Sequence, residues 1–330
     1  MRPDAAALVA PAVGRDRVIA FDKRGGAAGV AGIVRTARAV REAGFDAAIA
    51  VQRSLRTALV LALAGVPRRI GFAGAPGAPF YHRRVVASGR HARDRLLSLV
   101  EGLDVPRPDP PPDPRLVVDP AASRAVATLL SEAGLAPSDR LLVVAPGSAW
   151  ATKRWPAQRF GSLARALAPE FDAVAIVGAG GDAALAAAVV RGLSAGGGKT
   201  PLAIDLCGRT DTAGLVAAIE RSGLVVANDS AAGHVAGALG RPVVSLFGPT
   251  VPAFGFAPIG PRVRVVERDL ECRPCARHGG DACPIRTHAC MESIEVAQVA
   301  AAAREALADP GPGIPAAGGV AARRTSGDRP

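Results

Sequence analysis

One loop of the sequence combines small residues with concentrated positive charge, which suits it to phosphate binding. The segment PGSAWATKRWP, residues 146–156, follows a short apolar run. Gly147 and Ser148 offer backbone N–H groups and a hydroxyl, and Pro156 favours the first turn of a helix whose positive end would face the same place. Lys153 is one of three lysines in a chain with 40 basic residues, so we read it as a compact charge for an anion. An ordinary loop with a solvated Lys-Arg pair is the alternative.

A second polar cluster follows the apolar run 223–227. Asp229 or Ser230 is suited to capping the next helix, and His234 lies one turn further, so its side chain returns toward the same strand end. We predict that these three side chains are presented to a bound nucleotide sugar. After the apolar run 242–247, a third tight loop offers further phosphate contacts through Gly248, Pro249 and Thr250.

Four of the five cysteines fall in one stretch, as Cys272-x2-Cys275-x7-Cys283-x6-Cys290. Four soft ligands this close together could close a tetrahedral zinc site, which would be structural. The alternative is a set of reduced thiols, because the sequence shows no export signal and a reducing compartment follows. Cys207 stands apart and is expected in the core.

Short apolar runs alternate with helical stretches along the chain, which predicts an α/β protein. Predicted strands cover residues 5–10, 17–21, 46–51, 69–73, 116–118, 141–145, 173–177, 202–206, 223–227, 242–247 and 263–266. Predicted helices cover residues 29–43, 54–64, 90–103, 121–133, 156–167, 182–193, 212–221, 231–239 and 294–307. This order gives parallel sheets with helices on both faces, and such sheets bind ligands outside the carboxyl ends of their strands.

The length of 330 residues favours two doubly wound domains rather than one core. A Pro-rich stretch, residues 105–114, lies near the join, and we place the domains at 1–136 and 137–308. Residues 309–330 have no apolar periodicity and are expected to form a disordered tail.

The positive charge is concentrated in the first third of the chain. Residues 1–110 carry 18 Lys or Arg against 9 Asp or Glu, whereas residues 111–330 carry 22 against 20. The basic part should attract an anionic partner. Nucleic acid is disfavoured, because no aromatic stacking strand or zinc-finger helix accompanies the arginines. Without an apolar run long enough to span a bilayer, we expect a cytoplasmic protein.

Taken together and in this order, the loops resemble those of the ADP-heptose:lipopolysaccharide heptosyltransferases of glycosyltransferase family 9. The matching segments are PGSAWATKRWP, LVVANDSAAGHVAGALGRPVVSLFGPT and FDAAIAVQRSLRTALVLALAGVPRRIGF, and ECRPCARHGGDACPIRTHACMESI resembles the heptosyltransferase II branch. The resemblance covers roughly residues 15–305. It implies a GT-B fold, two facing Rossmann-like domains with the active site in the cleft between them.

The resemblance also implies a reaction: heptose passes from ADP-heptose to the inner core of lipopolysaccharide, with inversion and without a catalytic metal. The donor diphosphate and heptose would be held by Ser148, Lys153, Asp229, Ser230 and His234. The phosphorylated acceptor would be met by Arg53, Ser54 and Arg56, just after the predicted strand 46–51. The charge of residues 1–110 fits that acceptor and peripheral contact with the anionic inner membrane.

The sequence departs from the family in two places. Ala231 stands where the family has Gly after Asp-Ser, which should shift the entry to the helix. The family begins with a strand and a Ser-x-x-Gly-Asp loop whose Asp is the general base, and this sequence holds no such loop. Asp4 is not in that context, so the catalytic base is unassigned, and we expect weak or no activity from the chain as written. A start codon placed too far downstream would explain the difference.

Two other functions stay open from the sequence. One is a non-catalytic protein that binds ADP-sugar or the lipid A core, which would bind ADP and release none. The other is a nucleotide-sugar epimerase of the same fold, which would turn over the donor without an acceptor.

Overall fold

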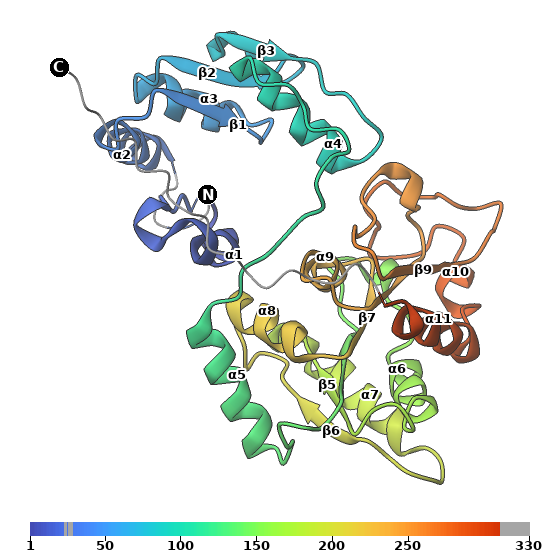
Figure 1. The fold of residues 1–330 in the computed structure, drawn as a ribbon. Coiled ribbons are helices and arrows are strands. Elements are labelled where there is room, and N and C mark those ends of the chain that lie inside the picture. The colour runs from blue at the N-terminus through green and yellow to red at the C-terminus, as the bar shows by residue number, and fades with distance from the viewer. Residues whose placement is uncertain (23–24, 26–28, 311–330) are drawn as a thin grey trace.

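The computed structural model describes residues 1–22, 25 and 29–310. The described chain forms two parallel α/β units joined by an extended segment (Figure 1). The predicted disordered tail lies outside the described residues, apart from residues 309 and 310.

The C-terminal unit is built on a six-stranded parallel sheet. Its strands are β4 (Leu141–Ala145), β5 (Ala173–Ile176), β6 (Leu202–Asp205), β7 (Leu224–Asn228), β8 (Val243–Phe247) and β9 (Val263–Glu267). They lie in the order β6-β5-β4-β7-β8-β9. Numbered within the unit this is 3-2-1-4-5-6, the Rossmann order, whose direction reverses between β4 and β7. The carboxyl ends of β4 and β7 therefore form the topological switch point.

Helices cover both faces of this sheet, so the unit is doubly wound as predicted. One face packs under α6 (Ala157–Ala166), α7 (Ala183–Ser194), α10 (Ala289–Glu292) and α11 (Val296–Ala308). The other packs under α5 (Pro120–Glu132), α8 (Thr212–Arg221) and α9 (Ala231–Ala238). Every residue of β4 and β7 is buried, which explains their unbroken Val and Leu runs.

The N-terminal unit is smaller. Its parallel sheet has the order β1-β2-β3, with β1 (Ala47–Ala50), β2 (Arg68–Phe72) and β3 (Arg83–Val85). Around it lie α2 (Gly29–Glu42), α3 (Leu55–Leu63), α4 (Ala92–Leu97) and a 3-10 segment, Ser98–Leu103. Ile70, Phe72 and Leu99 anchor its main apolar cluster. The prediction of one helix over 90–103 was wrong from residue 98 on, where the α-helix gives way to the 3-10 segment. The short polar strand β3 was not predicted.

Residues 5–10 were predicted as a strand, and the structure corrects this. They belong to α1 (Pro3–Val13), which starts with a proline in its first turn and with Asp4 at its positive end. The run is rich in alanine, the best helix former, and lacks the β-branched residues of a buried strand. Residues 17–21 are not a strand either, since a 3-10 turn, Arg15–Arg17, leads into them. Residues 116–118 run without regular structure beside α9, where Leu116 N donates to Ala238 O at 3.3 Å.

Packing assigns α5 to the C-terminal unit. Val126 and Leu130 of α5 and the following Leu135 are buried in the core under one face of the six-stranded sheet. The predicted boundary between residues 136 and 137 would separate α5 from the sheet that it covers. We therefore place the division in the extended segment before α5. Helix α1 also reaches this core through Leu8.

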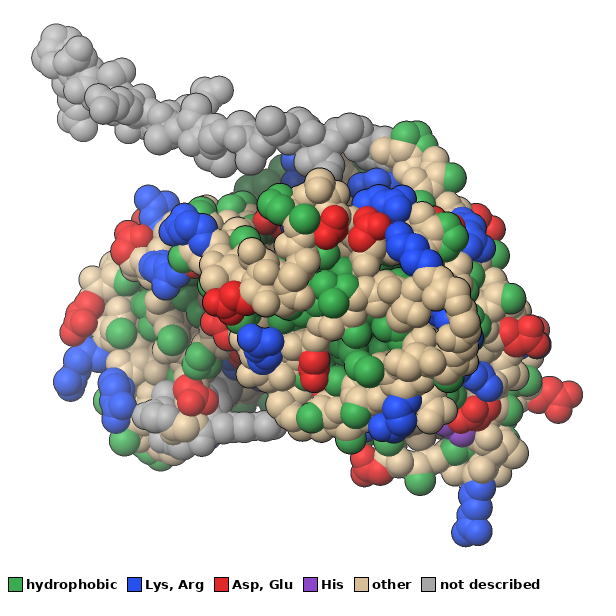
Figure 2. All heavy atoms as spheres, turned by 90° about the horizontal axis from the view of Figure 1, so that it is seen from below, with side chains coloured by type: hydrophobic (Ala, Val, Ile, Leu, Met, Phe, Trp, Pro, Cys, Tyr) green, Lys and Arg blue, Asp and Glu red, His purple; other side chains and the backbone are tan. Residues whose placement is uncertain are grey.

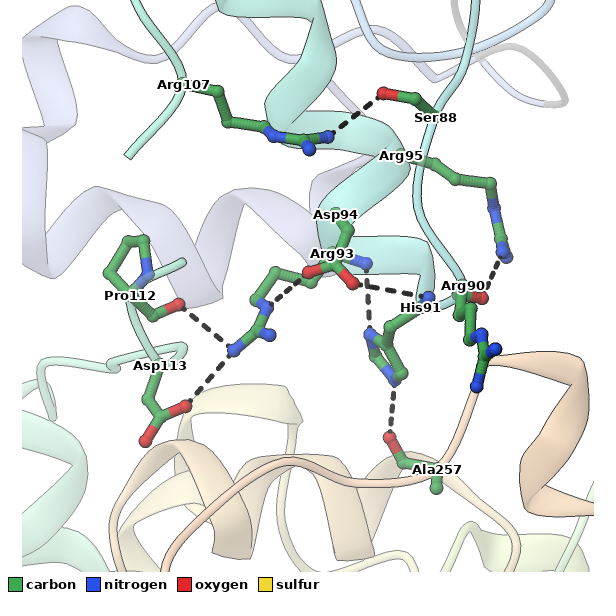
Figure 3. A network of polar contacts seen from close by, with 10 residues as sticks. All are labelled: Ser88, Arg90, His91, Arg93, Asp94, Arg95, Arg107, Pro112, Asp113 and Ala257. Carbon is green, nitrogen blue, oxygen red and sulfur yellow. Dashed lines mark hydrogen bonds and ion pairs between the residues drawn. The ribbon is translucent and has the colours of Figure 1, made fainter. Parts of the chain in front are cut away.

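The two units touch where α4 begins (Figure 3). His91 caps α4, with Nδ1 accepting from Arg93 N at 3.1 Å, and its Nε2 donates to Ala257 O of the C-terminal unit at 2.9 Å. Ala92 N donates to Gly255 O at 2.8 Å beside it. Arg93 also pairs with Asp113 of the joining segment at 3.2 Å. This contact fixes the start of α4 on the C-terminal unit.

On the face seen from below in Figure 2, basic and acidic side chains of the described residues lie among apolar ones. No helix in the described part of the chain is long and apolar enough to cross a bilayer.

Candidate functional site

Three loops meet at the switch point of the C-terminal sheet, and they meet on one carboxylate. Lys153 Nζ lies 2.5 Å from Asp229 Oδ2, with 12% of the lysine side chain and 10% of the aspartate side chain exposed. Thr250 Oγ1 donates to the same Asp229 oxygen at 2.8 Å. The loops after β4, β7 and β8, each of which the sequence assigned to donor binding, are thus joined by direct contacts.

A buried amide holds the first of these loops closed. Asn228, the last residue of β7, is fully buried, and its Oδ1 accepts from Trp155 N at 3.0 Å while its Nδ2 donates to Pro146 O at 2.8 Å. The two hydrogen bonds hold the first and last residues of the segment 146–155 next to the end of β7. Sequence reasoning assigned no role to Asn228, although a polar residue closing an apolar strand was a usable signal.

Arg154 supports the loop from within. Its Nη2 donates to Ser148 O at 2.8 Å and its Nε to the same oxygen at 3.1 Å. Arg154 therefore binds the backbone of its own loop, whereas Lys153 is the one of these two cations that contacts Asp229.

A cavity of about 740 Å³ opens beside this cluster, a volume within the range of small-molecule sites. It is lined by predicted donor residues: Gly147, Ser148, Lys153, Asp229 and Ser230. A second cavity of about 690 Å³, between α1, α5 and α8, has eight alanines among its 19 lining residues, and its charged groups are Arg15, Asp119, Arg209 and Asp211. We place the site in the first cavity, because that one holds the converging polar groups.

Among the lining residues that the sequence did not predict, three have side chains suited to ligand contact. Trp150 stands at the cavity with 39% of its surface exposed, and Asp182 and Asp211 contribute carboxylates. Asp182 Oδ2 accepts from Ala179 N at 2.9 Å, and Asp211 caps α8 by accepting from Gly214 N at 2.8 Å. Asp182 also lies close to Gly147 of the loop after β4, and this approach depends on the sheet order.

Four of the predicted donor residues are not part of the cavity lining: His234, Gly248, Pro249 and Thr250. Thr250 contacts Asp229, which does line the cavity, whereas Gly248 packs close to Met291 and Cys290 on the core side. Pro249 O accepts from Cys275 N at 3.2 Å. Ser230 is the N-cap residue of α9, and its side chain makes no capping hydrogen bond.

His234 lies one turn into α9, and its side chain is exposed at the surface. The protein atoms around it still remove part of its hydration, and this desolvation is the largest cause that lowers the pKa of His234. The charges of His91 and Lys153 lower it further, and Asp229 opposes them. His234 therefore favours its neutral form at this site.

The predicted acceptor residues are grouped in the N-terminal unit. Arg53, Ser54 and Arg56 occupy the carboxyl end of β1 and the start of α3, where Ser54 is the N-cap residue. The Arg53 guanidinium lies 4.7 Å from the centre of the Phe72 ring. They thus stand at the carboxyl edge of the smaller sheet, the usual place for a ligand.

The cysteine residues are all free thiols. No three His, Cys, Asp or Glu side chains within the described ranges are grouped to hold a metal ion. The zinc site at Cys272, Cys275, Cys283 and Cys290 gains no support from this geometry and stays a prediction, which metal analysis of the purified protein would test. Cys207 packs against the core as expected, and burial, with Asp205 and Asp182 nearby, raises the pKa of its thiol to about 12.

The chain forms two α/β units, each with a parallel sheet, and the larger unit has the Rossmann strand order and a polar cavity at its switch point. This is the architecture of the GT-B glycosyltransferases. The N-terminal sheet has three strands in the described chain, so it is smaller than the Rossmann-like domain that we predicted.

A family model for glycosyltransferase family 9 (heptosyltransferase) matches residues 33–283, and the chain belongs to this family. The protein is therefore a glycosyltransferase. The lipooligosaccharide heptosyltransferase 2 of Haemophilus influenzae is 27% identical over 263 residues, covering 74% of this chain and 73% of the relative.

Solved structures support the fold. The Escherichia coli ADP-heptose lipopolysaccharide heptosyltransferase II is similar with a TM-score of 0.67 at 24% identity, over 84% of this chain and 81% of that one. A family 9 glycosyltransferase from Veillonella parvula is similar with a TM-score of 0.76 at 22% identity, over 93% and 86% of the two chains.

Proposed function

We propose that this glycosyltransferase moves heptose from ADP-heptose to the inner core of lipopolysaccharide, with inversion at the anomeric carbon. The observation that carries the proposal is the Lys153–Asp229–Thr250 cluster beside a cavity at the switch point of a family 9 chain. The relatives named for lipopolysaccharide or lipooligosaccharide heptosyl transfer support the substrate class.

In this proposal the donor diphosphate lies against the loop after β4. The backbone N–H groups at Gly147 and Ser148 and the ammonium of Lys153 stabilise the charge that develops on ADP as its bond to the heptose breaks. Asp229 and Thr250 hold Lys153 in place before the donor arrives. Asp182 and Asp211 offer carboxylate oxygens to the hydroxyls of the donor.

The acceptor approaches from the N-terminal unit. Arg53 and Arg56 bind its phosphate groups, and the Ser54 hydroxyl adds a neutral hydrogen bond. The excess of basic residues in 1–110 draws the enzyme to the anionic cytoplasmic face of the inner membrane, where such an acceptor resides. Co-sedimentation with anionic vesicles, lost in high salt, is the expected sign of this contact.

The test is acceptor-dependent release of ADP by the full chain, with ADP-heptose as donor and two acceptors, lipopolysaccharide core without heptose and core that already carries one heptose. The expected result is slow transfer, because no catalytic base is assigned in this chain, with the acceptor mass rising by one heptose residue for each ADP released. ADP binding without any release would favour the non-catalytic binding protein. Donor turnover without the acceptor would favour the epimerase. Either result would overturn the proposed transfer.

A further inference from the structure

The segment between β9 and α10, residues 268–288, has no regular secondary structure and contains three of the cysteines; we name it the cysteine loop. It lies outside the cavity lining except at His278. Yet it contacts the backbones of two donor loops that are about 100 residues apart in the sequence, the loop after β4 and the loop after β8.

Arg273 makes the contact to the loop after β8. Only 5% of its side chain is exposed. Its guanidinium donates to Gly248 O, and its Nη2 donates to Thr250 O at 3.0 Å. Glu267 at 2.7 Å neutralises the buried charge. A buried cation thus satisfies two carbonyl groups of the loop whose Thr250 hydroxyl holds Asp229.

Thr152 makes the contact to the loop after β4. It is buried, and its Oγ1 donates to Gly280 O at 2.8 Å and accepts from Gly280 N at 2.9 Å. His288 Nε2 donates to Thr152 O at 2.7 Å. Thr152 directly precedes Lys153, so these bonds fix the backbone from which the lysine projects.

Close approach at this point depends on one glycine. Gly279 has φ +98°, and a Cβ there would lie 2.8 Å from Cβ of Trp150. A side chain at 279 would therefore strain the backbone and push the cysteine loop away from the loop after β4.

From these contacts we infer that the cysteine loop sets the position of the donor site, with Arg273 and Thr152 as positioning residues for Lys153, Asp229 and Thr250. The inference rests on the proposed function and deepens it. Lys153 and Thr250 share one Asp229 oxygen, at 2.5 and 2.8 Å, so a shift of either loop disturbs both contacts. Small displacements of positioned groups have large effects on binding and rate.

The experiment measures ADP affinity of the full chain by calorimetry for matched pairs of variants. Thr152→Val replaces one hydroxyl with a methyl group, and Thr152→Ser keeps the hydroxyl. Arg273→Ala removes the guanidinium, and Arg273→Lys keeps the charge. We expect Thr152→Val and Arg273→Ala to weaken ADP binding about tenfold, which is the size of one lost hydrogen bond. Thr152→Ser should recover nearly all of the affinity and Arg273→Lys part of it.

Steady-state kinetics separate positioning from a general loss of structure. The KM for the donor should rise in Thr152→Val and Arg273→Ala while the KM for the acceptor stays unchanged. Arg277→Ala, at an exposed position of the same loop, should behave as wild type. If Arg273→Ala fails to fold, the Thr152 pair decides the question, because its two members differ from wild type by a single group each.

Three results overturn the inference. Folded Thr152→Val with wild-type ADP affinity would remove the positioning role while leaving the proposed function intact. Equal losses in Thr152→Ser and Thr152→Val would show that the hydroxyl is irrelevant. Wild-type chain that binds no ADP would overturn the proposed function itself, and the inference with it.

Discussion

The two units of the molecule differ in how deeply they bury their sheets. In the C-terminal unit, β4, β5, β7 and β8 are buried along their whole length, and helices pack on both faces. In the N-terminal unit, β1 is mostly half-buried, and many of the buried apolar side chains are alanines. Large apolar side chains such as Val30, Val51 and Leu63 remain exposed there.

This difference indicates that the C-terminal unit is the more rigid of the two. The donor site lies on the well-packed sheet, where buried strands and Asn228 hold three loops on one carboxylate. The acceptor residues lie on the unit that buries less apolar area per residue, and less burial means less stabilisation. We therefore expect the donor half of the reaction to depend on preorganised geometry and the acceptor half on charge.

The largest expected effect is on the donor side. Lys153→Ala should lower the rate of ADP release about 10² to 10³-fold, the usual cost of removing a group that stabilises developing negative charge. It also leaves Asp229, only 10% exposed, without its cation. The assay is heptosyl transfer at saturating donor.

Lys199→Ala is the matched control for that change. Lys199 is the other lysine of the C-terminal unit; it is 59% exposed and pairs with Asp172 at the surface. Its removal should leave the rate unchanged. A Lys153→Ala enzyme as fast as wild type would mean that the site does not lie at this cluster.

The next largest expected effect is a loss of stability when the packing of the C-terminal unit is disturbed. Helices α6 and α7 touch through Gly161 and Gly192, and a Cβ at Gly161 would overlap the Val189 carbonyl oxygen. Gly161→Ala should therefore lower the free energy of unfolding by about 2 kcal/mol through overpacking. Gly181→Ala is the control, because its Cβ would meet nothing within 4 Å. Urea denaturation of both variants checks this, and equal stability of the two would contradict it.

What the sequence could predict follows the same division. The unbroken apolar runs of β4 and β7 predicted their strands, and α8 was predicted with its observed bounds because a 3.6-residue period is local. The polar loops after these strands indicated the candidate site. Asp182 and Arg273 could not be assigned, since Gly147 beside Asp182 and Gly248 beside Arg273 are 35 and 25 residues away in the sequence, and the sheet order brings them together.

The N-terminal unit was harder to predict. Residues 5–10 form helix rather than strand, because alanine-rich apolar sequence suits either state and the contact of Leu8 with the C-terminal core favours the helix. The polar strand β3 has no apolar alternation to reveal it. Its position depends on pairing with β2.

A smaller effect is expected on the acceptor side. Changing Arg53 and Arg56 together to Gln should raise the KM for the phosphorylated acceptor about tenfold, because charge-assisted bonds to phosphate are lost. The KM for the donor should not change. Arg84→Gln, an exposed position on β3, is the charge control.

Salt should sharpen that contrast. Contacts between exposed charges are screened, so raising the ionic strength should weaken acceptor binding in wild type and much less in the double variant. An acceptor KM that is independent of both Arg53 and Arg56 would remove the acceptor role from this edge of β1.

The smallest expected effect is the titration of His234. Desolvation by the surrounding protein atoms and the charges of His91 and Lys153 lower its pKa, so its NMR titration midpoint should fall below the ordinary value of about 6.5. Because the unfolded chain then binds the proton more readily, stability should decrease as the pH falls through that ordinary value toward the folded midpoint. Lys153→Ala removes a lowering influence and leaves the opposing Asp229 charge, so the midpoint should rise. An unchanged midpoint would show that the Lys153–Asp229 pair and His234 do not sense one another, and that α9 contributes no electrostatic coupling to the donor site.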